Sequence, residues 1–147
     1  MRRYQFKLQK VLDTKKIRED LIVVRLVELK RLAESQEQFL HMISGNQERT
    51  LRELSVRRRN GENGLPEELM YEEYLLKLER RIQETRLILR QLEEQIRETR
   101  RALCEAATER KMVEKIREKD YGTFVLEMER NDRKNLDEIA IQAHVRR

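Results

Sequence analysis

A heptad pattern from Tyr71 to Met112 is the feature that most constrains how this chain can fold. Apolar residues recur there at alternating steps of three and four, which is the a/d seam of a coiled coil. The seam comprises Leu75, Leu78, Ile82, Leu89, Leu92, Ile96 and Leu103, with Thr85, Thr99 and Ala106 at the remaining positions. Most intervening residues are Glu, Arg, Gln or Lys, so this helix must bury its narrow seam on another long helix.

The composition argues against a large globular core. Of the 147 residues, 38% are hydrophobic and 41% are charged, whereas an average soluble domain is about half apolar and about a quarter charged. The net charge of +5 is spread over interspersed basic and acidic residues, a pattern typical of solvated helices. We therefore expect no nucleic-acid partner, although Arg57, Arg58 and Arg59 form a dense basic group.

A second heptad stripe runs from Tyr4 to about Arg58. Its apolar positions are Leu8, Leu12, Ile22, Leu26, Leu29, Ala33, Leu40, Ile43 and Leu54, and its polar positions are Lys15, Glu19, Gln36, Gln47 and Thr50. Polar seam residues weaken a coiled coil but help to fix its register. The pair Gly45-Asn46 predicts a kink or a local loosening, because Gly costs a helix about 1 kcal/mol relative to Ala.

The short apolar run Leu21–Val24 is predicted to be helical, because the seam continues through it and its flanks are charged. It widens the apolar face of the first helix. Either a second docking surface near Leu21 and Val24 or a locally thicker core would explain that width.

The segment Asn60–Pro66 is the one convincing turn, and Pro66 followed by two glutamates is typical of a helix start. We predict an all-α fold, namely a long antiparallel two-helix coiled-coil hairpin with a C-terminal helical overhang. Residues 1–147 form a single coiled-coil domain, with helices at about 4–58 and 66–143 and a turn at about 59–65. If the fold-back centres near Glu62, residue i faces residue 125 minus i, so Leu8 lies near Arg117 and Leu40 near Thr85.

The overhang begins close to Asp120-Tyr121-Gly122-Thr123, where Gly122 again predicts a looser helix. Its apolar residues have no partner in the hairpin: Phe124, Val125, Leu126, Met128, Leu136, Ile139, Ala140, Ile141 and Val145. Such residues on an isolated helix indicate either fraying or a binding partner, and we favour the partner.

No arrangement typical of an enzyme is present, and we predict no catalytic, cofactor or metal site. The pairs Glu72–Glu73 and Glu93–Glu94 are adjacent in sequence, so their side chains diverge on a helix. His41 and His144 lack neighbours at metal-ligand spacing.

The lone Cys104 suits a reducing compartment, and no apolar run approaches the ~20 residues of a membrane span. We expect a cytoplasmic protein.

Three segments resemble the FliJ family of flagellar type III export proteins: Phe6–Leu12, Glu109–Lys119 and Arg133–Ala140. The resemblance implies a stalk-like, non-enzymatic coiled coil, similar to the central shaft of rotary ATPases, that serves flagellar biogenesis, motility and chemotaxis. Its implied partners are the hexameric flagellar export ATPase, the cytoplasmic domain of the export-gate membrane protein, and export chaperones whose delivery it assists. It would lie peripherally at the inner membrane, at the flagellar base.

The resemblance also implies which residues contact these partners. The ATPase-contact candidates are Phe6, Leu8, Val11, Leu12, Glu114, Lys115, Lys119, Leu136, Asp137 and Ile139. The export-gate candidates are Tyr71, Tyr74 and Leu78. On the facing helix Gly45 and Arg49 replace the aromatic residues that the resemblance implies.

Three other interpretations use the same helices. One is the stalk of a virulence-type secretion system or of a rotary ATPase, and a second is a coiled-coil nucleic-acid binder using Arg57–Arg59. The third is a structural homodimer whose seams pair between chains. We predict instead a monomeric hairpin of 18.0 kDa with a high frictional ratio in sedimentation.

Overall fold

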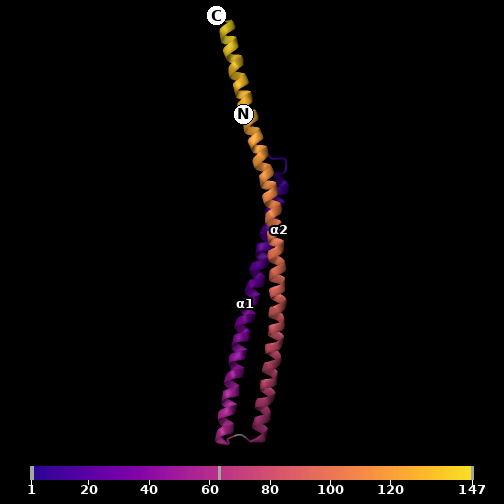
Figure 1. Ribbon diagram of the computed structural model, residues 1–147, viewed down its shortest axis with the longest axis vertical. Coiled ribbons are helices and arrows are strands. Elements are labelled where there is room, and N and C mark those ends of the chain that lie inside the picture. The colour runs from indigo at the N-terminus through magenta and orange to yellow at the C-terminus, as the bar shows by residue number, and fades with distance from the viewer. Residues whose placement is uncertain (1, 63, 147) are drawn as a thin grey trace. The chain divides into compact units, whose positions relative to one another are not determined.

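The computed structural model describes residues 2–62 and 64–146, which form two helices packed against each other. Helix α1 spans Gln9–Asn60 and helix α2 spans Leu65–Val145. The two helices run antiparallel and are joined by one short connection (Figure 1). The predicted all-α helical hairpin is confirmed.

Contacts within the chain define two compact units. The turn unit is Ile22–Ala102, and the end unit combines Met1–Leu21 with Leu103–Arg147. That residues 1–147 behave as a single domain stays a prediction.

The core of the turn unit is the predicted seam. Ile43, Leu78 and Ile82 form a buried cluster, and Phe39 and Leu40 pack against it. The other buried seam residues of this unit are Leu26, Leu29, Leu54, Thr85 and Leu89. Thr85 is tolerated there because its hydroxyl donates a hydrogen bond to the backbone carbonyl of Arg81, 2.7 Å away.

Interhelical contacts fix the register of the two helices. In the turn unit Gln47 donates to Glu79 at 2.8 Å, and the residue numbers add to 126 (47 and 79). In the end unit Lys15 donates to Glu109 at 2.8 Å, and the numbers add to 124 (15 and 109). Both sums lie within one of the predicted value of 125.

The connection is built as a glycine-capped helix end. Gly61 has a φ of 63°, a left-handed conformation that costs Gly least. Its N–H bonds to the carbonyl of Arg58, and the N–H of Glu62 bonds to that of Arg57, which is the Schellman motif. Pro66 then lies in the first turn of α2, where its missing N–H needs no helical acceptor.

The helix boundaries differ from the predicted ones. Helix α1 begins at Gln9 rather than near residue 4, and it ends at Asn60 rather than near 58. Helix α2 extends slightly beyond the predicted 66–143 at both ends. The late start of α1 has a tertiary cause, because Tyr4 is engaged with α2 instead of continuing the helix. Helix α1 is uninterrupted at Gly45, and α2 is uninterrupted at Gly122.

In the end unit, Leu12 and Ala106 are the buried apolar residues. Helix α2 continues past the N-terminal segment toward the yellow end of the ribbon (Figure 1). Residues 129–146 are all exposed, which agrees with the predicted helical overhang. The prediction that Phe124 has no partner in the hairpin is wrong, because its ring contacts Tyr4 at 5.3 Å between centroids, so the exposed overhang begins later than Asp120.

Two glycine substitutions test this description of the backbone. Gly45→Ala should raise the free energy of unfolding by about 0.5–1 kcal/mol, because a Cβ there meets nothing within 4 Å and Ala favours the helix. Gly61→Ala should lower it by about 1 kcal/mol, because Ala is strained at a φ of 63°. Urea unfolding followed by circular dichroism at 222 nm measures both. A stabilising Gly61→Ala would contradict the glycine-capped turn.

Candidate functional site

Charged side chains connect the helices in the end unit. Lys15 bonds to Glu109 at 2.8 Å, and Arg18 approaches the same carboxylate at 3.5 Å. One turn further along α1, Glu19 pairs with Arg110. Arg110 also binds Glu114 on its own helix at 2.9 Å. The Glu19 and Arg110 side chains are only 19% and 22% exposed, so this pair is shielded more than an ordinary surface salt bridge.

These contacts shift the titration of two groups. The hydrogen bond from Lys15, assisted by its charge, holds the pKa of Glu109 below its usual range. Hydrogen bonds to Glu19 and then Glu114 raise the pKa of Arg110. Both shifts favour the charged forms. The charged contacts therefore favour one alignment of the two helices in the end unit.

An aromatic contact joins the N-terminal segment to α2. The Tyr4 ring lies edge-on to Tyr121 at 5.1 Å between centroids, and tilted against Phe124 at 5.3 Å. Its hydroxyl donates to Asp120 at 3.0 Å and lies 3.4 Å from the backbone carbonyl of Arg117. Desolvation raises the pKa of the Tyr4 hydroxyl, which therefore stays protonated as a donor. We call Tyr4, Asp120, Tyr121 and Phe124 the Tyr4 clasp.

The clasp was missed in the sequence. A signal was available, because the register rule pairs residue 4 with residue 121. The contact was not predicted, because residues 4–8 were expected to belong to the first helix. A surface hollow of about 380 Å³ lies beside the clasp, lined by Tyr4, Glu114, Arg117, Glu118 and Tyr121.

All ten ATPase-contact candidates lie in the end unit, but not on one surface. Leu12 is 0% exposed and serves the core, so a partner cannot reach it in this packing. Phe6 and Glu114 are half-buried, and the other candidates are exposed: Leu8, Val11, Lys115, Lys119, Leu136, Asp137 and Ile139. Lys119 and Leu136 are about 26 Å apart along α2 at 1.5 Å per residue. The candidates therefore divide into a group around the clasp and a group on the overhang.

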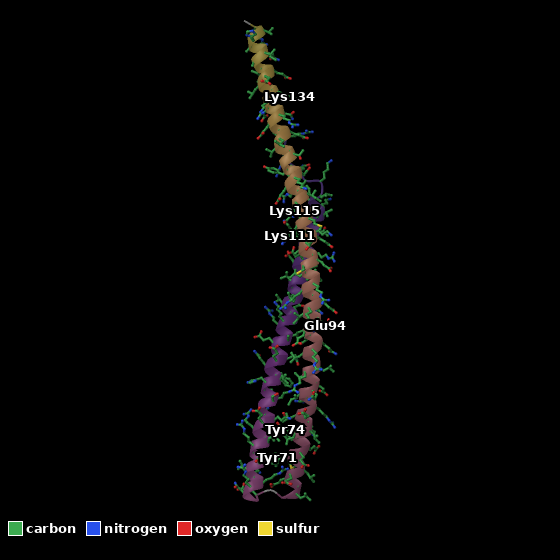
Figure 2. All side chains as sticks on the ribbon, in the orientation of Figure 1. Tyr71, Tyr74, Glu94, Lys111, Lys115 and Lys134 are labelled. Atoms are coloured by element: carbon green, nitrogen blue, oxygen red, sulfur yellow. The ribbon has the colours of Figure 1, made fainter. Side chains whose placement is uncertain are left out.

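The gate candidates lie on α2 of the turn unit, and Tyr71 and Tyr74 are close to the connection (Figure 2). Tyr74 is 46% exposed, whereas Leu78 is 6% exposed and belongs to the core cluster. Tyr71 is half-buried, because its hydroxyl donates to Glu53 at 3.2 Å and Arg57 sits over its ring at 5.6 Å. Desolvation raises the Tyr71 pKa.

A hollow of about 500 Å³ opens beside these tyrosines, lined by Arg57, Glu67, Met70, Tyr71 and Tyr74. Its walls are largely aromatic and aliphatic, with one cation and one carboxylate. Such a surface suits a partner's apolar side chain. Of the three gate candidates, Tyr74 is the one best placed for direct contact.

Two of the three arginines at the connection form ion pairs within the hairpin. Arg57 bonds to Glu53 at 3.3 Å, and Arg58 bonds to Glu68 at 3.0 Å. Carboxylate partners reduce the positive charge available to phosphates, which disfavours the nucleic-acid alternative.

The described residues provide neither a metal cluster nor a membrane span. Within 2–62 and 64–146, no three His, Cys, Asp or Glu side chains gather as they would around a metal ion. In the same residues neither helix is long and apolar enough to cross a membrane.

The fold and its surfaces define an all-α coiled-coil protein whose exposed aromatic, aliphatic and charged side chains suit contact with other proteins. The family described as "Flagellar FliJ protein" matches residues 4–147, so the chain belongs to that family. No curated protein and no solved structure gives a significant match. The protein has a role in flagellar export and interacts with components of the export apparatus. The family is known as a non-enzymatic export component.

The charge contacts of the end unit predict acid sensitivity. Because the folded protein lowers the pKa of Glu109, this interaction stabilises the fold above the ordinary glutamate pKa of about 4.3. The stabilisation is lost as the pH falls from there through the lower pKa of the folded protein. We expect the melting temperature to fall below that pH. Glu109→Gln should lower it near pH 7 and weaken its pH dependence. Glu105→Gln is the matched control, and an equal effect of both variants would contradict the role of Glu109.

Two substitutions separate folding from binding at the gate candidates. Leu78→Ala should lower the free energy of unfolding by about 2–5 kcal/mol, because it empties a buried position. Tyr74→Ala should change it by no more than about 0.5 kcal/mol, as for other exposed positions. Urea unfolding measures both. A large loss in Tyr74→Ala would show that this side chain serves the fold.

Proposed function

We propose that this protein is a stalk-like component of the flagellar type III export apparatus that binds the hexameric export ATPase and the cytoplasmic domain of the export gate. Through these contacts it assists the delivery of export chaperones and their substrates. It works as a non-enzymatic, monomeric hairpin in the cytoplasm, peripherally associated with the inner membrane. Membership of the FliJ family supports the export role.

The exposed overhang is the observation that best supports the proposed contact with the ATPase. Leu136 and Ile139 are 66% and 63% exposed on a helix whose residues 129–146 are all exposed. An isolated helix loses the tertiary packing that supplies most helical stability, and it leaves apolar surface in water. Insertion into the ATPase ring would cover these side chains.

The second group of ATPase candidates supports a contact that extends to the clasp. Leu8 and Val11 are 40% and 42% exposed, and Lys115 is exposed on α2 (Figure 2). Aliphatic side chains flanked by charges are typical of a transient protein interface with an apolar centre and a polar rim.

At the gate, the proposed contact centres on Tyr74 and the hollow beside it. A half-exposed tyrosine offers a large apolar ring and a polar hydroxyl, and this combination is enriched among residues that dominate binding energy. Leu78 supports the surface from the core rather than touching the partner.

The ATPase contact is tested by the hydrolysis rate of the flagellar export ATPase from the same organism, with and without this protein. Stimulation should be lost with a chain ending at Arg130, which retains Tyr121 and Phe124 of the clasp and lacks Leu136 and Ile139. A chain ending at Asp120 should also lose it, because it lacks the overhang and two clasp residues.

Point variants distinguish a specific contact from mere helix length. Leu136→Ala/Ile139→Ala should reduce stimulation about tenfold, as expected when two interface anchors are truncated. The matched control is Ile141→Ala/Val145→Ala, because these side chains are 62% and 78% exposed on the same segment. No response to the intact protein over a wide concentration range would refute the ATPase role. Gate binding would then be tested separately with Tyr74→Ala.

A further inference from the structure

The positive charge of this protein is concentrated in its first residues. Residues 2–21 contain seven basic and three acidic side chains, a net charge of +4, whereas residues 103–147 contain ten of each. Four of the seven basic residues are Arg2, Arg3, Lys7 and Lys10, and residues 2–10 contain no Asp or Glu. We call residues 2–10 the basic segment. It accounts for +4 of the total charge of +5.

Residues 2–8 of the basic segment precede α1, and residues 9 and 10 are its first two residues. Side-chain exposure alternates with a period of two residues in the part before the helix. Tyr4 and Phe6 are half-buried, whereas Arg3, Gln5 and Lys7 are exposed. Such alternation is typical of an extended chain with one face against a support. The aromatic side chains face the protein, and the cations face solvent.

The Tyr4 clasp is what holds this segment in place. Two aromatic rings of α2 contact Tyr4 at 5.1 and 5.3 Å between centroids, and its hydroxyl bonds to Asp120 at 3.0 Å. Aromatic pairs of this geometry stabilise a contact beyond the effect of area burial. A hydrogen bond to a carboxylate adds to them.

We infer that the Tyr4 clasp is a positioning device that presents the basic segment, already held in place, to an acidic surface of the export ATPase. The inference rests on the proposed ATPase contact and specifies its chemistry. A free segment would lose backbone entropy for every residue that becomes ordered on binding. A segment already held by the clasp has lost much of that freedom before the partner arrives.

The chemistry of the segment favours an acidic protein over a lipid surface. Insertion into a membrane interface needs a continuous apolar face, but the clasp turns Tyr4 inward and Phe6 is half-buried. The exposed apolar side chains nearby include Leu8, Val11 and Tyr121, which suit a small apolar contact within a charged interface. Clustered cations also accelerate association with an acidic partner in a salt-dependent manner.

The clasp itself is tested without any partner. Trypsin cleavage after Lys7, followed by mass spectrometry, reports how firmly the segment is held. Tyr4→Ala should be cleaved several times faster than the intact protein, whereas helical circular dichroism should be unchanged because Tyr4 lies outside α1. Tyr4→Phe keeps the ring and loses the hydroxyl, so its rate should fall between them. Equal cleavage of Tyr4→Ala and the intact protein would overturn the inference.

Binding to the export ATPase tests the positioning role. We expect Tyr4→Ala to weaken the affinity about tenfold, from the ordering cost of one or two residues. Arg2→Glu/Arg3→Glu should weaken it by a similar factor at low salt, and the difference should shrink at high salt. The matched control is Arg100→Glu/Arg101→Glu, because these two arginines are also adjacent and exposed but lie on α2 outside the basic segment. A control that weakens binding equally would overturn the inference in favour of a general charge effect.

Two further probes separate the possible failures. A polyglutamate peptide provides an acidic surface without the ATPase. If it prefers the intact protein to Tyr4→Ala while the ATPase binds neither, the proposed ATPase contact fails and an acidic partner is retained. Equal binding of the peptide to both proteins would overturn the positioning role. Vesicles of phosphatidylserine and phosphatidylcholine that bind the intact protein and Tyr4→Ala equally, but not Arg2→Glu/Arg3→Glu, would overturn the inference in favour of a lipid partner.

Discussion

Burial of one narrow apolar seam is the interaction on which the rest of this structure depends. Leu12, Leu29 and Ile82 are the large side chains that are fully buried, and each contributes about 1.5–3 kcal/mol relative to exposure in water. Neither helix can bury its stripe alone, since the remaining faces are charged. The seam therefore requires the antiparallel pairing, and the pairing determines which side chains remain available to other proteins.

Polar side chains complete the seam where apolar residues are missing. In the end unit Lys15, Glu19, Glu109 and Arg110 form cross-helix contacts, and in the turn unit Gln47 reaches Glu79. Partly buried ion pairs add little net stability because desolvation opposes the attraction. Their value lies in register, because a shifted pairing would leave shielded charges without partners.

The sequence was most informative where local periodicity determines structure. Most heptad positions, the register and the glycine turn follow from spacing and from the conformational freedom of Gly61, and they are observed. Leu8 is the exception, because this predicted seam residue precedes α1 and is 40% exposed. The N-terminal segment could not be predicted in this way, because its conformation depends on Tyr4 contacting residues more than a hundred positions away. The same limit applies to partner sites. Leu12 and Leu78 match a family pattern, but their burial assigns them to packing in this structure.

The clasp also marks a change in mechanical stiffness along α2. Before Tyr121 the helix is braced by the N-terminal part of the chain, and beyond Met128 every described residue is exposed. A braced pair resists bending more than one helix, which curves readily. Thermal bending in the end unit should therefore concentrate just beyond the clasp, near Met128, so that the overhang bends about this point. Such compliance would let its tip find an off-axis binding site while the paired helices stay in register.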